Sequence, residues 1–271
     1  MVIDGKKISE GILENLKKSA KPRGFLAVFF VGENAASDSF IKQKEKIAKE
    51  LGVDFRLYKF PENITQDGLR KEILKIAEHK TCGGAIIQLP LPSHINRQYV
   101  LNAISREKDV DVLGERALGA FYAGRNLVLP PAVGVVETIL GIMNKELGIM
   151  NVTVIGAGFL VGKPISSWLE NKVMGLNIFN EFTKDLRSKL KDADIIVSGV
   201  GKGNLFSAED LKNGAIVIDF GYGMSEGKIS GDFNPIIHNS EFLIHYTPTP
   251  GGTGPILVAK LFENFFKLNE K

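Results

Sequence analysis

Residues 152–165 read VTVIGAGFLVGKPI and carry the strongest signal for a fold in this chain. Its first four residues are apolar or β-branched and predict a buried strand, and a helical pattern follows its last glycine. Between strand and helix lie Gly156, Gly158 and Gly162. This arrangement lets backbone N–H groups approach a pyrophosphate, which also meets the positive end of the helix. The segment therefore predicts a dinucleotide site on a Rossmann-like domain.

The glycine spacing leaves a second interpretation open. The pattern is GxGxxxG, one residue longer than the common GxGxxG, and an ordinary tight turn between a strand and a helix also contains glycines. A further strand at 176–179 is followed by Glu181, near the place where dinucleotide-binding folds put an acid that binds the adenosine ribose. A solvent-facing loop carboxylate explains Glu181 equally well.

Strand and helix patterns alternate through the rest of the chain. Strands that read as buried on both faces and alternate with helices indicate βαβ units and parallel sheets, so the predicted class is α/β. The predicted strands are 25–32, 84–90, 152–156, 194–200 and 215–221, and the predicted helices are 9–20, 36–51, 66–79, 133–146 and 161–171.

The chain is expected to form two α/β domains. The turn-rich segment 123–132, AGRNLVLPPA, is the best candidate for a passage between them. We predict a first domain of residues 1–122 and a Rossmann-like domain of residues 123–254. The last helical pattern follows a Pro/Gly cluster and could pack back on the first half, so residues 255–271 are assigned to the first domain.

Composition excludes several classes of protein. A chain of 271 residues with 44% hydrophobic and 24% charged residues is long enough for two cores and too apolar for disorder. Its 34 basic residues are scattered among 31 acidic ones, so we expect no nucleic-acid partner. No apolar run approaches the roughly 18 residues of a membrane span, so we expect no membrane partner.

The expected compartment is the cytoplasm. The N-terminus MVIDGKKISE has charges where a secretory signal is apolar, and the single Cys82 cannot form an internal disulfide. No metal site is predicted, because the histidines share no metal-ligand spacing. The four histidines are His79, His94, His238 and His245.

Polar residues from three segments are candidates for chemistry. Lys44 follows Phe40 by four residues and so shares its helix face, although a lysine in such a helix is usually solvated. Gln88 ends a predicted strand, at the edge where open α/β sheets bind ligands. Asp109 and Asp111 stand two apart, where the common role is a turn or cap acid. A lysine, an amide and a carboxylate that met could lower the lysine pKa and hold a polar heterocycle.

These residues resemble the bifunctional methylenetetrahydrofolate dehydrogenase/cyclohydrolase family over nearly the whole chain. QLPLP and PGGxGP in particular are rarely found together outside this family. The matching pieces, in family order, are IDGK from position 3, VGENAAS from 31, GGAIIQLPLPSHIN from 83, KDVD from 108, GxGxxVGKP from 156, GAIVIDFG from 214, GD from 231 and TPTPGGTGP from 247.

The resemblance implies an activity and a role for each folate-side residue. Methylenetetrahydrofolate would be oxidised by hydride transfer to NAD(P), and water would open the methenyl product to the formyl product at the same site. Lys44 would be the catalytic lysine, which carries the proton in the hydrolytic step. Gln88 would hold this lysine and help to keep it neutral, and Asp111 would hydrogen-bond the pterin.

The resemblance also implies the cofactor side and the assembly. Gly156, Ala157 and Gly158 would contact the phosphates, and Tyr222 would lie beside the nicotinamide ribose. The family fold has two α/β domains with a cleft between them and is often a homodimer. The residues that would line the cleft are Pro250, Gly251 and Gly252.

The sequence departs from the family pattern at three places. Most members carry tyrosine where Phe40 stands, so stacking on the substrate would survive while the hydroxyl contact to the lysine is lost. The family glycine after KDVD is Val112 here, and the family segment PCTP reads LPPA at 129–132. A catalytically impaired folate or nucleotide binder is therefore the alternative function. A second rival, an NAD(P) dehydrogenase of another small substrate such as shikimate or an amino acid, does not explain QLPLP together with PGGTGP.

The choice of cofactor stays open between NADP and NAD. A carboxylate such as Glu181 would repel a 2′-phosphate but can accept hydrogen bonds from a free ribose hydroxyl, which favours NAD. Lys184 or Arg187 could reverse this preference by reaching the phosphate. We place NADP first because family usage is the broader guide.

Overall fold

The computed structural model of the protein describes residues 1–33, 35–225, 227–236 and 243–270. The chain divides into two compact units. Unit 1 consists of Met1–Glu10 and Ala132–Leu257, and unit 2 consists of Gly11–Pro131 and Val258–Lys271. The division at 131/132 falls within the turn-rich segment in which a passage was expected, and the first ten residues join unit 1.

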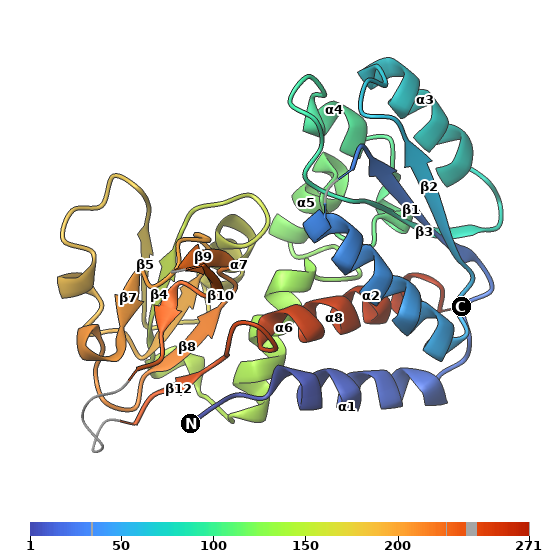
Figure 1. The fold of residues 1–271 in the computed structure, drawn as a ribbon. Coiled ribbons are helices and arrows are strands. Elements are labelled where there is room, and N and C mark those ends of the chain that lie inside the picture. The colour runs from blue at the N-terminus through green and yellow to red at the C-terminus, as the bar shows by residue number, and fades with distance from the viewer. Residues whose placement is uncertain (34, 226, 237–242, 271) are drawn as a thin grey trace. The chain divides into compact units, whose positions relative to one another are not determined.

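Unit 2 is built on a three-stranded parallel sheet with the order β2-β1-β3 (Figure 1). The central strand β1 (Phe25–Val31) is buried along its whole length, as its unbroken apolar sequence requires. The strand β3 (Cys82–Ile87) lies on one side of it and β2 (Phe55–Phe60) on the other. The sequence of β2, FRLYKF, mixes charged and apolar residues because this strand is only half-buried. It therefore lacks the apolar run from which the other strands are predicted, and β2 is absent from the predicted strands.

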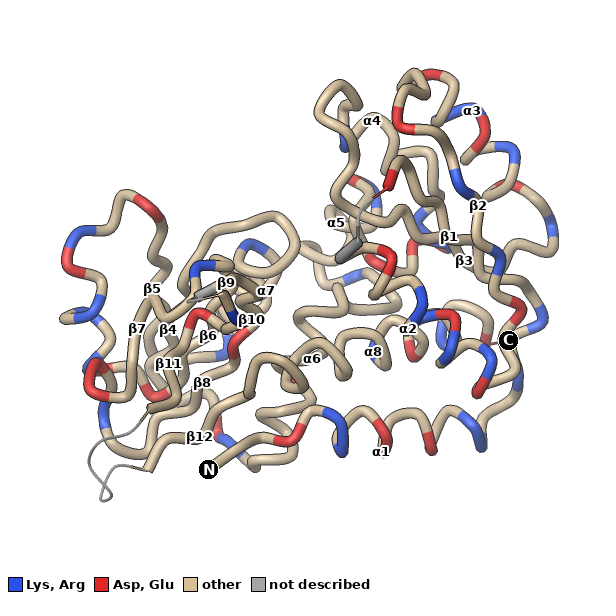
Figure 2. Tube along the Cα trace, viewed as in Figure 1, with Lys and Arg blue, Asp and Glu red and all other residues tan. Residues whose placement is uncertain are grey.

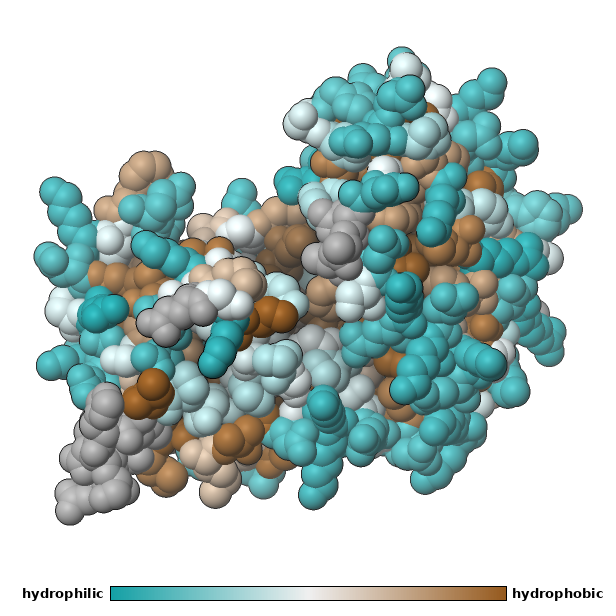
Figure 3. Space-filling view, in the orientation of Figure 1, coloured by the Kyte–Doolittle hydropathy of each residue, from teal (hydrophilic) through white to brown (hydrophobic). Residues whose placement is uncertain are grey.

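Helices on both sides bury this sheet. The helices α1 (Gly5–Lys18), α2 (Ala35–Leu51) and α8 (Thr253–Leu268) contribute to one core with β1 and β3, in which Phe262 and Phe265 of α8 are fully buried. Acidic and basic residues are mixed along α2 and α3 (Figure 2), and hydrophilic side chains cover the visible face of α2 (Figure 3). The remaining helices of unit 2 are α3 (Gln66–Ala77), α4 (Arg97–Leu101), η1 (Arg106–Lys108) and α5 (Glu115–Tyr122).

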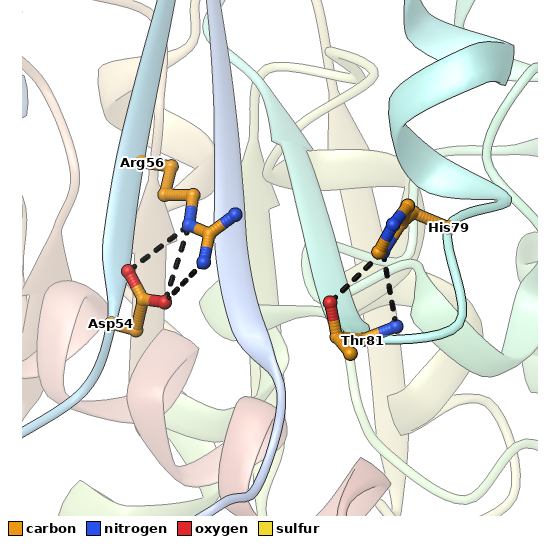
Figure 4. Close-up of polar contacts among 4 residues, drawn as sticks. All are labelled: Asp54, Arg56, His79 and Thr81. Atoms are coloured by element: carbon orange, nitrogen blue, oxygen red, sulfur yellow. Dashed lines mark hydrogen bonds and ion pairs between the residues drawn. The ribbon is translucent and has the colours of Figure 1, made fainter.

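The amino ends of β2 and β3 carry local polar contacts between exposed side chains (Figure 4). Arg56 Nη2 lies 2.7 Å from Asp54 Oδ2, and its guanidinium covers the ring of Phe25 at 4.0 Å. His79 Nδ1 and Thr81 Oγ1 are 2.9 Å apart. These contacts are local pairs at the amino edge, whereas open parallel sheets bind their ligands at the carboxyl edge.

Unit 1 contains a five-stranded parallel sheet with the order β12-β8-β6-β4-β5 (Figure 1). The second strand along the chain lies on one side of β4 and the third on the other side, so the switch point of this sheet lies between β4 and β6. The predicted Rossmann-like parallel sheet is therefore confirmed. The strands are β4 (Asn151–Ile155), β5 (Gly175–Phe179), β6 (Ile195–Ser198), β8 (Ile216–Asp219) and β12 (His245–Tyr246).

Shorter elements complete unit 1. The helix α7 (Gly162–Leu169) follows the glycine-rich turn, and α6 (Pro131–Ile142) precedes β4. The other elements are η2 (Leu147–Ile149), η3 (Arg187–Lys189), the hairpin of β9 (Gly223–Ser225) with β10 (Lys228–Ser230), the parallel pair of β7 (Phe206–Ser207) with β11 (Phe233–Asn234), and η4 (Ala208–Asp210). None of the helices in the described ranges is long and apolar enough to cross a membrane.

A close contact explains why IDGK and PGG both contain glycine. A β-carbon on Gly5, the first residue of α1, would collide with the carbonyl oxygen of Gly252. Gly252 itself has no room for a side chain, because a β-carbon there would lie 2.7 Å from the Cβ of Thr247. Backbone meets backbone at this point, so both positions require glycine.

We predict opposite effects for two glycine substitutions in α1. Gly5→Ala should lower the free energy of unfolding by about 3 kcal/mol, because the new methyl group overlaps a backbone carbonyl. Gly11→Ala should raise it by about 0.5–1 kcal/mol, because that position is exposed, has open space and gains helix propensity. Urea unfolding of both variants measures the difference. Equal effects of the two substitutions would contradict the contact.

Candidate active site

Lys44 and Gln88 meet at the carboxyl edge of the sheet in unit 2. Gln88 directly follows β3, and its backbone N–H donates to the carbonyl of Phe29 in β1 (2.9 Å). Lys44 Nζ donates to Gln88 Oε1 at 3.0 Å. The Gln88 amide nitrogen donates to the carbonyl of Leu89 at 2.8 Å, which turns the amide oxygen toward the lysine. Two residues that are far apart in the sequence thus form one polar pair.

Lys44 is not one of the solvated lysines of α2. Only 6% of its surface is exposed. Burial lowers the pKa of its amine, because the charged form loses water that a neutral amide cannot replace, and the charge of Asp111 opposes this shift. The neutral form of the amine is therefore more favoured at this site than it is for a lysine on the protein surface.

Asp109 and Asp111 have different partners. Asp109 is buried beside β3, where it bridges Ala85, and its Oδ2 accepts the N–H groups of Leu113 (3.0 Å) and Gly114 (2.7 Å). It is a turn acid, as the common role of such aspartates suggested. Asp111 is half-buried; burial raises the pKa of its carboxyl, and the nearby charge of Lys44 lowers it. Lys44 is bonded to Gln88 and lies close enough to Asp111 for each charge to shift the pKa of the other group, so the three residues share one region of unit 2.

The loop that carries Asp111 is strained. Val112 has a φ of 56° and is fully buried, although a β-branched residue avoids this left-handed region. Such a conformation costs on the order of 1–3 kcal/mol and persists only where the surroundings enforce it. Here Asp109 binds the two amides that follow Val112, and Asn264 donates to the carbonyl of Val110 at 2.9 Å. The loop thus keeps a glycine-like conformation without the family glycine.

Asn264 is a site-supporting residue that the sequence interpretation missed. It is buried in α8, and its amide also donates to the carbonyl of Leu129 at 2.8 Å. It therefore joins the Asp111 loop to the LPPA segment, the two places where the sequence departs from the family pattern. A lone amide in the apolar stretch FENFF was the available signal. Phe40 lies on α2 with 36% of its surface exposed, so its ring is accessible to a ligand.

The glycine-rich turn follows β4 in unit 1. Gly156 has a φ of 95°, and a β-carbon on Gly162 would collide with its carbonyl oxygen, so packing alone requires these two glycines. A β-carbon on Gly158 would meet nothing within 4 Å. An ordinary tight turn therefore does not account for Gly158, whereas close approach of a pyrophosphate to the backbone does. Ala157 and Gly158 are exposed. The turn fits the phosphates of a dinucleotide.

The other predicted residues of unit 1 lie in loops at the carboxyl edge of the same sheet. Glu181 is exposed and follows β5, and Tyr222 follows β8 with 55% of its surface exposed. The segment that follows β12 contains the third group of predicted residues. These residues are Pro250, Gly251, which has a φ of 99°, and the buried Gly252.

A basic cavity lies between the loops that follow β5 and β6. It has a volume of about 530 Å³, and Arg187, Ser188 and Lys202 are among its lining residues. Arg187 is partly neutralised, since its Nε lies 3.7 Å from Asp210 Oδ2, and Asp185 also lines the cavity. The cavity thus offers Arg187 and Lys202 as cations that could bind a phosphate, while Asp185 and Asp210 partly offset their positive charge.

Within the described residues, no group of His, Cys, Asp and Glu side chains is arranged to hold a metal ion. His238, one of the four histidines considered above, lies outside those residues.

Two family descriptions match the chain. Tetrahydrofolate dehydrogenase/cyclohydrolase, catalytic domain, matches residues 3–111, and tetrahydrofolate dehydrogenase/cyclohydrolase, NAD(P)-binding domain, matches residues 130–271. The chain belongs to the tetrahydrofolate dehydrogenase/cyclohydrolase family. The bifunctional protein FolD of Nautilia profundicola is 37% identical over 276 residues, which cover 98% of this chain and 96% of the relative.

Solved structures of family members are similar to the chain. The bifunctional FolD enzyme from Campylobacter jejuni has a TM-score of 0.92 at 34% identity, with 99% of this chain and 98% of that chain covered. FolD from Trypanosoma brucei, complexed with NADP and an inhibitor, has a TM-score of 0.90 at 28% identity, with 99% and 96% covered. The resemblance inferred from the motifs is confirmed.

The buried Asp109 makes the stability of this family member depend on pH. Burial raises the pKa of Asp109 to about 7, although the amide of Gly114 opposes the shift. An unfolded aspartate has a pKa of about 4, so between about pH 4 and 7 the folded state holds a proton that the unfolded state releases. The free energy of unfolding contributed by this group should therefore fall as the pH rises through this window and stay constant above it.

The comparison that isolates this effect is wild type against Asp109→Asn, which cannot titrate. We expect the wild-type free energy of unfolding to fall relative to that of the variant by roughly 2–4 kcal/mol between pH 4 and 7. Urea unfolding at several pH values measures it. Parallel curves for the two proteins would show that Asp109 does not titrate in this range.

Proposed function

We propose that this chain oxidises methylenetetrahydrofolate to methenyltetrahydrofolate with a nicotinamide dinucleotide and hydrolyses the product to formyltetrahydrofolate. The observation that carries the proposal is the buried Lys44, bonded to Gln88 and close to Asp111, in a member of the tetrahydrofolate dehydrogenase/cyclohydrolase family. Unit 2 is the folate-binding unit, and unit 1 binds the dinucleotide. The intact lysine, amide and carboxylate group speaks against the catalytically impaired alternative, and the two family matches speak against a dehydrogenase of another small substrate.

Lys44 performs the proton chemistry of the hydrolytic step. Water adds to the methenyl carbon, the carbon–nitrogen bond of the ring opens, and one proton is released for each formyl product. A neutral Lys44 amine accepts that proton, and its lowered pKa makes the neutral form available. Gln88 holds Nζ in one position through the 3.0 Å hydrogen bond. The amine is therefore already oriented to accept the proton when the ring opens.

Asp111 and Phe40 bind the folate. Asp111 presents a carboxylate that can accept hydrogen bonds from the pterin N–H groups, and the strained Val112 and its partners fix the loop that carries it. The exposed ring of Phe40, one helical turn before Lys44, stacks on the substrate. The segment at Pro250, Gly251 and Gly252 contributes backbone contacts to the substrate.

The glycine-rich turn of unit 1 holds the dinucleotide. When bound, the nicotinamide ring supplies the acceptor for the hydride that leaves the methylene carbon. Gly156, Ala157 and Gly158 would bind the phosphates through backbone N–H groups, because Gly158 leaves open space beside the turn. Glu181 would bind the adenosine ribose, and Tyr222 would lie beside the nicotinamide ribose.

NADP is the proposed cofactor, with NAD as the alternative. The basic residues of the cavity between the β5 and β6 loops favour a 2′-phosphate, and the Trypanosoma brucei relative is complexed with NADP. Glu181 favours NAD. The partners are small molecules, since the mixed surface charges do not suit nucleic acid. We further propose a homodimer in the cytoplasm.

The proposed function predicts two successive absorbance changes. Wild-type protein mixed with methylenetetrahydrofolate and NADP should produce the methenyl absorbance, which then decays as water opens the ring. The same mixture with NAD should react more slowly. Lys44→Met should slow the decay of the methenyl absorbance by at least about 100-fold, because the proton acceptor is missing. Wild-type protein that gives no methenyl signal with either dinucleotide would refute the proposal.

Phe40→Tyr should alter the balance of the two steps. The added hydroxyl restores a polar contact near Lys44, so the hydrolytic rate should rise severalfold while the dehydrogenase rate changes by less than about twofold. Separate assays of methylene oxidation and of added methenyl substrate give the two rates. An unchanged ratio would show that the hydroxyl does not assist Lys44.

Glu181→Arg should shift the cofactor preference toward NADP. Replacing a carboxylate by a guanidinium near the 2′-phosphate should lower the KM for NADP by about tenfold and raise that for NAD. Steady-state rates with both dinucleotides measure the shift. A wild-type preference for NADP that the substitution leaves unaffected would remove Glu181 from the ribose site.

A further inference from the structure

Asp232 is a fully buried carboxylate in unit 1 that the proposed mechanism does not use. It belongs to the GD motif and lies between β10 and β11. Its Oδ2 accepts the hydroxyl of Ser198 at 2.6 Å and the N–H of Val200 at 2.8 Å, and its Oδ1 accepts the N–H of Lys202 at 2.8 Å. One side chain thus binds the end of β6 and the first half of the loop that follows it.

The bound loop lies against the glycine-rich turn. Position 199 is packed on Val161, since a β-carbon there would lie 2.8 Å from Val161 Cγ1. A β-carbon on Gly156 would lie 3.2 Å from Val200 Cγ2 and 3.3 Å from the carbonyl oxygen of Gly199. The loop after β6 and the turn after β4 are therefore neighbours at the switch point of the sheet, where a dinucleotide is expected to bind.

The backbone around Asp232 fixes the far end of the same loop. The carbonyl of Gly231 accepts the N–H of Asn204 at 3.0 Å, and the carbonyl of Asp232 accepts the N–H of Phe206 at 3.2 Å. A β-carbon on Gly221 would collide with the Asp232 carboxylate, so the space for this side chain is reserved by a glycine. Three hydrogen bonds to a buried carboxylate hold the loop more strongly than three bonds to a neutral acceptor would.

We infer that Asp232 is a positioning residue for the dinucleotide. It holds residues 198–202 in the conformation that completes the phosphate-binding turn, without touching the ligand itself. This inference rests on the proposed function, because it concerns the same dinucleotide site. It assigns a role in ligand affinity to a residue that lies about 75 positions after the glycine motif.

Asp232→Asn tests the inference, because the substitution keeps the shape but removes the charge and one acceptor oxygen. The dissociation constants of NADP and NAD are measured by titration calorimetry, and KM and kcat by the dehydrogenase assay. We expect the Kd and KM of the preferred dinucleotide to rise about tenfold, the effect of losing one charge-assisted hydrogen bond, with kcat and the cofactor-independent hydrolytic rate within about twofold. Asp194→Asn is the matched control, since Asp194 accepts a backbone N–H at the amino end of the same strands (2.7 Å). It should leave both Kd values unchanged.

Ser198→Ala provides a second variant that removes only one of the three bonds, and it should raise the Kd about threefold. If the circular dichroism spectrum of Asp232→Asn shows that this variant is not folded, the dinucleotide affinity of Ser198→Ala tests the inference instead. Unchanged dinucleotide affinity in a folded Asp232→Asn protein, or in Ser198→Ala, would overturn the inference. Affinity that falls equally in Asp194→Asn would also overturn it, because the effect would then be one of general stability. Wild-type protein that binds neither dinucleotide would instead refute the proposed function.

Discussion

The catalytic unit depends on the burial of the Lys44 amine against an amide instead of a carboxylate. A carboxylate at hydrogen-bond distance would stabilise the ammonium form, whereas the oxygen of Gln88 orients the amine without replacing the water that a full charge needs. Asp111 acts on the same amine as a nearby charge and moderates the shift. Burial thus lowers the pKa of the Lys44 amine below that of an exposed lysine. The position of the amine follows from where α2 and β3 place Lys44 and Gln88.

In each unit, the amino edge and the carboxyl edge of the parallel sheet carry different kinds of contact. In unit 2 the amino edge carries exposed pairs such as Asp54 with Arg56, while the carboxyl edge carries Gln88. In unit 1 the carboxyl edge carries the glycine-rich turn and the loop held by Asp232, while Asp194 at the amino edge binds the backbone of Asn151. Parallel strands direct all their carboxyl ends to one edge, so residues that are distant in the sequence gather there without long connecting segments.

Features that depend on neighbouring residues could be predicted from the sequence, whereas contacts between distant residues could not unless a family motif indicated them. The apolar runs that became β1, β3, β4, β6 and β8 were recognised because burial on both faces leaves an unbroken pattern, and β2 was missed because an edge strand does not. The contact between Lys44 and Gln88 followed from family motifs, not from helix periodicity, which made Lys44 a surface residue. Asn264 belongs to none of these motifs, and Asp232 lies in the GD motif without a role that the motif reveals. Neither role could be predicted, because the partners of these side chains lie in other parts of the chain.

Gly158 separates the requirements of folding from those of binding. Gly156 and Gly162 have neighbours that exclude a side chain, but the protein leaves the space at position 158 empty. A methyl group there would meet no atom of the folded chain within 4 Å and would occupy only the space in which we propose that a phosphate binds. Directed evolution for thermal robustness alone would therefore not detect the loss of this glycine. Under the proposed function, a library screened by melting temperature would collect well-folded proteins that no longer bind a dinucleotide.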